Sequence, residues 1–308
     1  MVQHSNVSIE PQSPSKQDKP LYYELLPEAK KDIPVKRNYH FKLSTDTVGN
    51  WHSYGHFVSM FYNGLSMFFP AGETMFIKSV QAHRYATQTD ALLSKQVSAF
   101  VAQEAIHGRE HQIYNDQIRT VYPWVTYAER GAAWLCYMVL TYLPIRMQLA
   151  ATVALEHWTG ILAGCALENL DNFNGVDESY SMIWHWHALE ETEHKAVAFD
   201  VYSAIYGYGV RAYLDKFLAL WLSSILLWTM AGFSFLCQAC YDLSIFNPIE
   251  WLNLFSFLWI YPGQMRGVFV EYFEFLNPKF HPWLHDNRYT MKDMAEIQAK
   301  MDNATFSK

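Results

Sequence analysis

The sequence has little of several features that define other classes of protein. Its 308 residues include only 14 glycines, and no Gly-rich nucleotide-binding loop occurs. Lys and Arg number 23 against 30 Asp and Glu, which gives a net charge of −7. Because no basic block stands out against this acidic balance, we expect no nucleic-acid partner.

Cysteine is also scarce. The four cysteines lie in apolar runs, and the N-terminus is polar rather than signal-like. Both features predict a reducing, cytoplasmic location. Cys237 and Cys240 have the spacing of a redox or zinc pair, but no second pair accompanies them, so we expect small buried side chains here.

Apolar and aromatic residues, in contrast, are abundant. They make up 51% and 17% of the chain, which is enough to fill a large core and argues against disorder. Pro70 interrupts the first helical pattern and either kinks that helix or starts a new one. Apolar residues recur at helical spacing over 51–85, 90–121, 145–169 and 179–205, with a further apolar segment over 131–143.

The composition changes at both ends of the chain. Residues 1–45 are rich in Pro, Ser, Lys and Gln and show no period, which predicts a mobile tail and an arm anchored by residues 35–41. Residues 291–308 are expected to form a polar C-terminal tail. Between the two we expect a single helical domain over 46–290.

A long uncharged run stands out near the C-terminus. Residues 217–240 contain no charged residue, and this length is sufficient for a transmembrane helix, whereas the second apolar run, 251–263, is too short. The hairpin 217–263 therefore has two interpretations. It either enters a bilayer from the cytoplasmic side or covers the bundle, where it would build a substrate tunnel or a dimer interface.

One short stretch near residue 190 has the spacing of a metal site. His187, Glu191 and His194 are separated by four and three residues, which places them on one helix face at about 100° per residue. A carboxylate and two imidazoles on one face can reach the same metal ion. A single Glu-x-x-His is common by chance, so this stretch alone is only suggestive.

The rest of the chain completes the pattern. Glu104 and His107 form a second Glu-x-x-His, and Glu73 and Glu156 lie in otherwise apolar helical runs. The order is Glu, Glu-x-x-His, Glu, Glu-x-x-His, with one element per helix. This is the ligand set of a ferritin-like four-helix bundle with a di-iron or di-manganese carboxylate site, here with extra apolar helices at the C-terminus.

Burial explains why these residue types belong together. A carboxylate in an apolar helix face is costly unless it is paired or bound to a metal. Four glutamates balance two divalent ions, so the centre is neutral. The mixture of imidazole and carboxylate suits iron, with manganese as the alternative.

Other polar residues flank these seven. His111 lies one turn beyond His107, and we expect it to support a ligand rather than bind metal. Glu190 and Glu193 are expected to support ligands or face solvent. His157 points about 100° away from Glu156 and is expected to be packed or on the surface.

The local sequence resembles a bacterial family of predicted metal-dependent hydrolases, whose members are thought to be ferritin-like. The resemblance runs from about residue 35 to 285 and is carried by residues 69–80, 103–111, 154–157 and 186–196. The ligand order alone is similar to that of di-iron arylamine N-oxygenases, which also place a His four residues before the last Glu. This second resemblance implies O₂ chemistry but not the substrate.

These observations favour a di-iron oxidase or oxygenase that activates O₂ and acts on an apolar, lipid-like or aromatic substrate. Glu73, Glu104, Glu156 and Glu191 would be catalytic, and with His107, His187 and His194 they would hold both ions. We expect an external electron donor, a homodimer and contact with the inner face of the membrane. The alternative is a metal-dependent hydrolase at the same site. Iron storage is disfavoured because acidic entry clusters are lacking.

Overall fold

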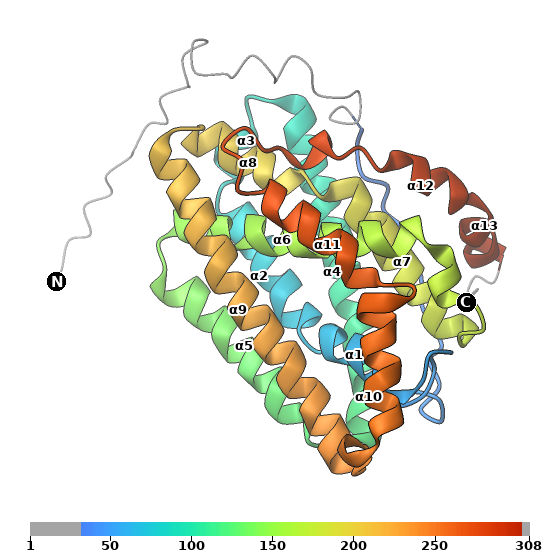
Figure 1. Cartoon of the computed structure of the whole chain (residues 1–308). Coiled ribbons are helices and arrows are strands. Elements are labelled where there is room, and N and C mark those ends of the chain that lie inside the picture. The colour runs from blue at the N-terminus through green and yellow to red at the C-terminus, as the bar shows by residue number, and fades with distance from the viewer. Residues whose placement is uncertain (1–31, 304–308) are drawn as a thin grey trace.

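The computed structural model describes residues 32–303, in which an arm without helices, 32–55, precedes a series of helices (Figure 1). The prediction of an all-α fold is confirmed. The expected mobile tail over residues 1–31 lies outside the described residues, as do the last five residues.

Four helices carry all seven predicted ligands and pack against one another. They are α2 (Phe69–Gln81), α4 (Ala91–Val121), α6 (Ile145–Glu168) and α7 (Glu178–His194). Helix α2 packs on α4 and α6, and α7 packs on α6 and α4. The α4 helix begins as predicted, because the side chain of Asp90 caps the backbone N–H groups of Leu92 and Leu93.

Two segments with a helical pattern are divided into shorter helices, the first at the predicted interruption by Pro70. The segment 51–85 forms α1 (His56–Ser66), α2 and the short α3 (Arg84–Thr87), and Pro70 lies in the first turn of α2. Pro70 therefore starts a new helix, where its fixed φ is favourable. The predicted helix 179–205 is wrong at its centre, because α7 ends at His194 and α8 (Val197–Tyr206) follows.

The division after α7 coincides with contacts that are distant in sequence. Lys195 is buried, and its ammonium donates hydrogen bonds to His285 O and Asn287 Oδ1, both at 2.7 Å. These partners lie on the C-terminal segment, so the chain turns at Lys195 to reach them. His194 consequently becomes the last residue of α7 and faces the interior of the bundle.

The C-terminal half adds further helices around the four. Helix α9 (Val210–Tyr241) packs on α1, α5 (Val125–Tyr142) and α6, so part of the predicted apolar hairpin does cover the bundle. The remaining helices are α10 (Pro248–Phe255), which leads into a π-helical turn (Ser256–Ile260), α11 (Gln264–Glu274), α12 (Arg288–Asp293) and α13 (Ala295–Asn303).

Helices α6 and α9 are both long and apolar enough to cross a membrane by length and composition. Their environments differ, because 83% of the most apolar window of α6 is buried, against 44% for α9. Helix α6 is therefore the core helix of the bundle. Helix α9 lies beside α5 at the edge of the bundle (Figure 1), and one of its faces is exposed.

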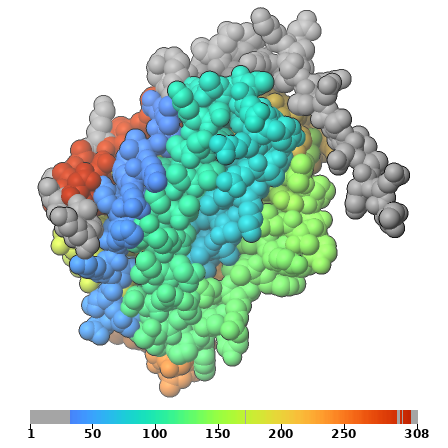
Figure 2. All heavy atoms as spheres, turned by 180° about the vertical axis from the view of Figure 1, so that it is seen from behind, coloured from blue at the N-terminus to red at the C-terminus, as the bar shows by residue number. Residues whose placement is uncertain are grey.

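The N-terminal arm packs along α4, as Figure 2 shows for the blue segment beside the teal helix. Its backbone at Phe41 donates to Glu110 Oε2 at 2.9 Å, and its carbonyl at Val35 accepts from Gln103. The rings of Tyr39 and Phe41 are buried against Trp186 of α7. The arm thus joins α4 to α7 on the outer side of the four ligand-bearing helices.

Candidate metal centre

The structure brings the seven predicted ligands together in the middle of the bundle. None is more than 4% exposed. Helix α2 supplies Glu73, α6 supplies Glu156, and the other ligands come from α4 and α7: Glu104, His107, His187, Glu191 and His194.

These side chains form three groups whose ligand atoms lie within 4.8 Å of one another. The groups are Glu73 with His107 and His187, Glu104 with Glu156 and His194, and Glu104 with His107 and Glu191. The first two groups share no residue, whereas the third takes one member from each and adds Glu191. This arrangement suits two neighbouring cations with carboxylates between them.

The polar atoms of the centre fit a metal because they lack other partners. Among the described residues, both carboxylate oxygens of Glu73, Glu104 and Glu156 are buried without a hydrogen bond. His194 Nε2 lies 3.0 Å from Glu104 Oε1, yet the two do not meet the geometry of a hydrogen bond. Buried polar groups without partners are costly. Here they converge on shared points where cations would satisfy them.

Each histidine holds its other ring nitrogen in a hydrogen bond, which fixes the nitrogen that faces the centre. His194 Nδ1 lies 2.9 Å from Gln103 Oε1, so Nε2 faces inward. His107 Nε2 lies 3.0 Å from Glu190 Oε2, so Nδ1 faces inward. Such outer hydrogen bonds are typical of histidines that ligate metals.

His187 is held by a longer chain of hydrogen bonds. Its Nδ1 lies 2.7 Å from His111 Nε2, and His111 Nδ1 lies 2.9 Å from the Ser66 hydroxyl, which donates to Asn115 Oδ1 at 2.7 Å. His187 Nε2 is thereby directed at Glu191 Oε1, 3.0 Å away. His111 belongs to none of the three groups and supports His187.

The arm completes the outer layer of hydrogen bonds. Arg37 forms an ion pair with Glu193 at 2.7 Å, and its backbone N–H donates to Glu190 Oε1 at 3.2 Å. Glu190 is fully buried, and burial raises its pKa to about 8 although Arg37 opposes the shift. The spacing of the ligands gives no indication of Arg37, because it lies far from them in sequence. Gln103 and Ser66 were also missed.

Burial and the charges of neighbouring side chains both shift the pKa values of the candidate ligands. Burial, reinforced by neighbouring carboxylates, raises the pKa of Glu73 and Glu156 well above the ordinary value. For His194, burial lowers the pKa, but Glu191 and Glu104 outweigh it, so the pKa is well above the ordinary value. The pKa of Glu191 is well below its ordinary value because His194 and His187 outweigh burial.

The remaining candidates lie outside the centre. His157 is buried, with its ring 4.8 Å from that of Phe275, and it joins none of the three groups. Cys237 is buried and Cys240 half-buried, and both are free thiols. Neither cysteine belongs to a group of potential metal ligands in the described part of the chain.

Two apolar cavities reach the centre. The larger is lined by His187 and Glu191 together with aromatic side chains that include Tyr62 and Trp184. The smaller is lined by Glu73 and by mostly apolar residues of α1, α2, α6 and α9. A small apolar molecule in either cavity would contact the metal ligands directly.

The class of this protein follows from its fold and its site. The helical fold, the buried carboxylates and the three oriented imidazoles are features of a helical metal-binding protein. The model of a family described as predicted metal-dependent hydrolase matches residues 35–286, so the chain belongs to that family. The predicted resemblance to this family is confirmed. No curated protein and no solved structure matches significantly. The ligand order favours an O₂-activating enzyme, with a metal-dependent hydrolase as the alternative. Membership of this family supports the hydrolase better than the O₂-activating enzyme.

Proposed function

We propose that the protein is a metal-dependent hydrolase that cleaves an ester or a related bond in an apolar substrate at a two-cation centre. The observation that carries this proposal is the set of buried carboxylate and imidazole atoms that lack hydrogen-bond partners and converge in groups. The family description agrees with it. Two divalent cations would polarise the scissile carbonyl and lower the pKa of a water molecule.

The chain itself contributes position, charge and exclusion of water. Glu73, Glu104, Glu156 and Glu191 balance the charge of two divalent cations, and the three histidines would complete their coordination. Gln103, Glu190 and His111 hold these imidazoles in one tautomer. The apolar cavities would bind the substrate and limit the access of bulk water to the centre.

The test combines metal content with turnover. The purified protein is stripped of metal, reloaded separately with Zn²⁺, Mn²⁺ or Fe²⁺, and assayed on aryl esters of straight-chain acids. We expect about two cations per chain and hydrolysis that Glu104→Ala and Glu191→Ala abolish. Retention of two cations per chain by both variants would refute the ligand assignment. A fully loaded protein that hydrolyses no ester, amide or phosphate would refute the reaction.

Oxidation by O₂ is the second candidate. It is favoured by the ligand set of four carboxylates and three histidines, which suits iron, beside cavities lined by aromatic and aliphatic side chains. Ferrous iron is loaded without air and O₂ consumption is followed with a separate electron donor. Consumption coupled to substrate oxidation, without ester hydrolysis, would replace the hydrolase by an oxidase or oxygenase.

We further propose that the exposed face of α9 binds a membrane surface on the cytoplasmic side. Leu218, Trp221, Leu222 and Ile225 are each about half exposed and recur at helical spacing, in a run without a charged residue. The exposed Arg211 precedes them and suits anionic headgroups. In a flotation assay, the protein should rise through the gradient together with anionic liposomes. The double variant Trp221→Ser, Leu222→Ser should no longer bind the liposomes and should stay at the bottom. A lipid-independent dimer through this face would contradict the proposal.

A further inference from the structure

The two apolar cavities beside the metal centre share a wall. Both are lined by Leu65, Phe69, Thr159 and Leu162. The first cavity, termed the His187 cavity, ends at His187 and Glu191, and the second, termed the Glu73 cavity, ends at Glu73. They therefore approach the same centre from neighbouring directions.

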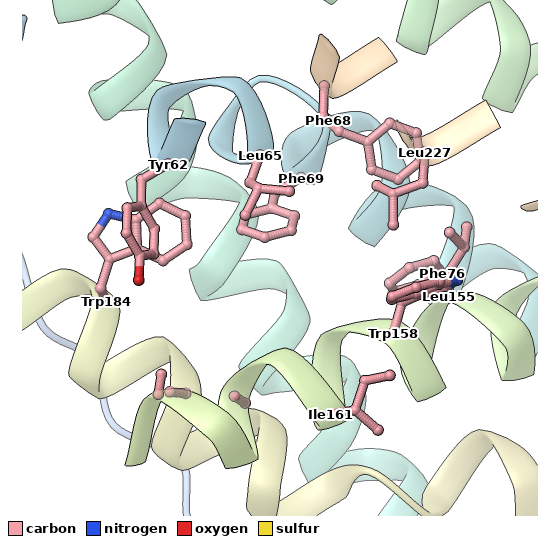
Figure 3. Packing of buried hydrophobic residues seen from close by; sticks show 14 of the residues in the cluster. Tyr62, Leu65, Phe68, Phe69, Phe76, Leu155, Trp158, Ile161, Trp184 and Leu227 are labelled. Carbon is pink, nitrogen blue, oxygen red and sulfur yellow. The ribbon is translucent and has the colours of Figure 1, made fainter. Parts of the chain in front are cut away.

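Phe69 stands between the two cavities. In Figure 3 its ring lies between Tyr62 and Trp184 on one side and Phe68, Phe76 and Leu227 on the other. The ring is held by contacts of 4.7 Å with the ring of His187 and 4.8 Å with that of His111, measured between ring centroids. Phe69 is 7% exposed and is the first residue of α2.

The cavities differ in size and in lining. The larger His187 cavity is lined by five aromatic rings besides that of His187, among them those of Tyr62 and Trp184, and by the Gln264 amide. The smaller Glu73 cavity is lined by the rings of Phe68, Phe69 and Phe76 and by four leucines, which include Leu155 and Leu227. The larger cavity, with more aromatic rings, suits an aromatic group, and the smaller, leucine-rich cavity suits an unbranched chain.

We infer that the substrate carries two apolar groups, one on each side of the bond that is cleaved, and that Phe69 separates them. This inference rests on the proposed hydrolase. An aromatic group would occupy the His187 cavity and an alkyl chain the Glu73 cavity, with the carbonyl at the metal centre between them. Phe69 is thus a specificity-determining residue.

The reaction consumes one water molecule. The water oxygen forms a bond to the carbonyl carbon, and the bond from that carbon to the ester oxygen breaks with its electron pair. The alkoxide takes up one proton of the water, and the other proton is lost from the new acid. The products are one carboxylate and one alcohol, each carrying one of the two apolar groups.

The experiment compares matched variants that narrow one cavity each. Leu227→Phe narrows the Glu73 cavity, and Ala166→Phe narrows the His187 cavity. The substrates are phenyl and naphthyl esters of acids with increasing chain length, together with alkyl esters of benzoic and naphthoic acids. Leu155→Phe and Ala163→Leu are second variants of the same two cavities in case either of the first does not fold.

In the wild type, kcat/KM should rise about fourfold per methylene until the Glu73 cavity is full. Leu227→Phe should shorten the chain length at which the rise stops and leave the naphthyl-to-phenyl preference unchanged. Ala166→Phe should lower that preference by about tenfold and leave the chain-length profile unchanged. Phe69→Ala joins the cavities, so longer chains should be accepted. Variants that change both profiles together, or neither, would overturn the inference.

Binding separates this inference from the proposed reaction. Aryl alkyl ketones carry the same two groups around a carbonyl and are not hydrolysed. Their dissociation constants are measured by calorimetry on the metal-loaded protein and its variants. If no ester is cleaved but the ketones show the same variant pattern, the hydrolase fails and the two-cavity assignment holds. If the ketones do not bind, or bind without that pattern, the assignment fails whatever the esterase activity.

Discussion

Glu104 provides the sharpest test of the metal centre, because its carboxylate belongs to two of the three ligand groups. Replacing it by Gln keeps the size of the side chain and removes the charge. Burial raises the pKa of Glu104 although His194 opposes the shift, so burial disfavours the charge that the amide removes. We therefore expect the metal-free variant to be as stable as the wild type or more stable.

The metal-loaded proteins should differ in the opposite direction. A cation present at 100 times its dissociation constant stabilises the folded state by about 2.7 kcal/mol. For a large domain this corresponds to a rise in Tm of roughly 5 to 10 °C per site. Glu104→Gln should lose most of this rise, because it weakens both groups that contain Glu104.

Thermal unfolding with chelator and with excess Mn²⁺ or Zn²⁺ measures both effects, and elemental analysis gives the metal content. Glu178→Gln is the matched control, since Glu178 is exposed on the same helix as Glu191 and joins no ligand group. It should keep the full response to metal. If Glu104→Gln destabilised the metal-free protein and still responded to metal like the wild type, Glu104 would be a structural residue and not a ligand.

The remaining predictions concern protons and the outer hydrogen bonds. Because the pKa values of Glu73 and Glu156 are raised, these two carboxyl groups bind more protons in the metal-free fold than in the unfolded chain above pH 4.5, so their contribution to stability should fall as pH rises from there. A metal ion must displace these protons when it binds, so metal affinity should rise with pH. A pH indicator in weak buffer should detect the release of protons on metal binding. A metal affinity that does not depend on pH would contradict this prediction. His111→Ala should weaken metal binding by about 10- to 100-fold, because it removes the hydrogen bond that orients His187. Chelator competition measures this change in affinity. An unchanged affinity would show that His111 does not support the metal centre.

The sequence predicted which of the candidate ligands share a helix face, because this depends only on their spacing, a local property of a helix. Glu104 and His107, or His187, Glu191 and His194, share a face in any regular helix, and the structure keeps both faces. The capping of α4 by Asp90 was likewise predictable, because the cap and its partners are close in sequence.

The features that were not predicted depend on contacts distant in sequence. The break after His194 arises because Lys195 binds Asn287, 92 residues further on, and no local pattern signals it. Arg37 reaches Glu193 across 156 residues. Helical spacing gave His111 only as a neighbour of His107, whereas the fold pairs it with His187 on another helix.

The arm also sets an order for assembly. Residues 35–41 are synthesised long before their partners Glu190 and Glu193, which lie on α7. The part of the docking surface that α7 provides therefore does not exist until α7 has been made, although α4 offers Glu110 and Gln103 earlier. Arg37 and its backbone can close over Glu190 only at that late stage. Until then Glu190, which holds His107, lacks its contacts with Arg37.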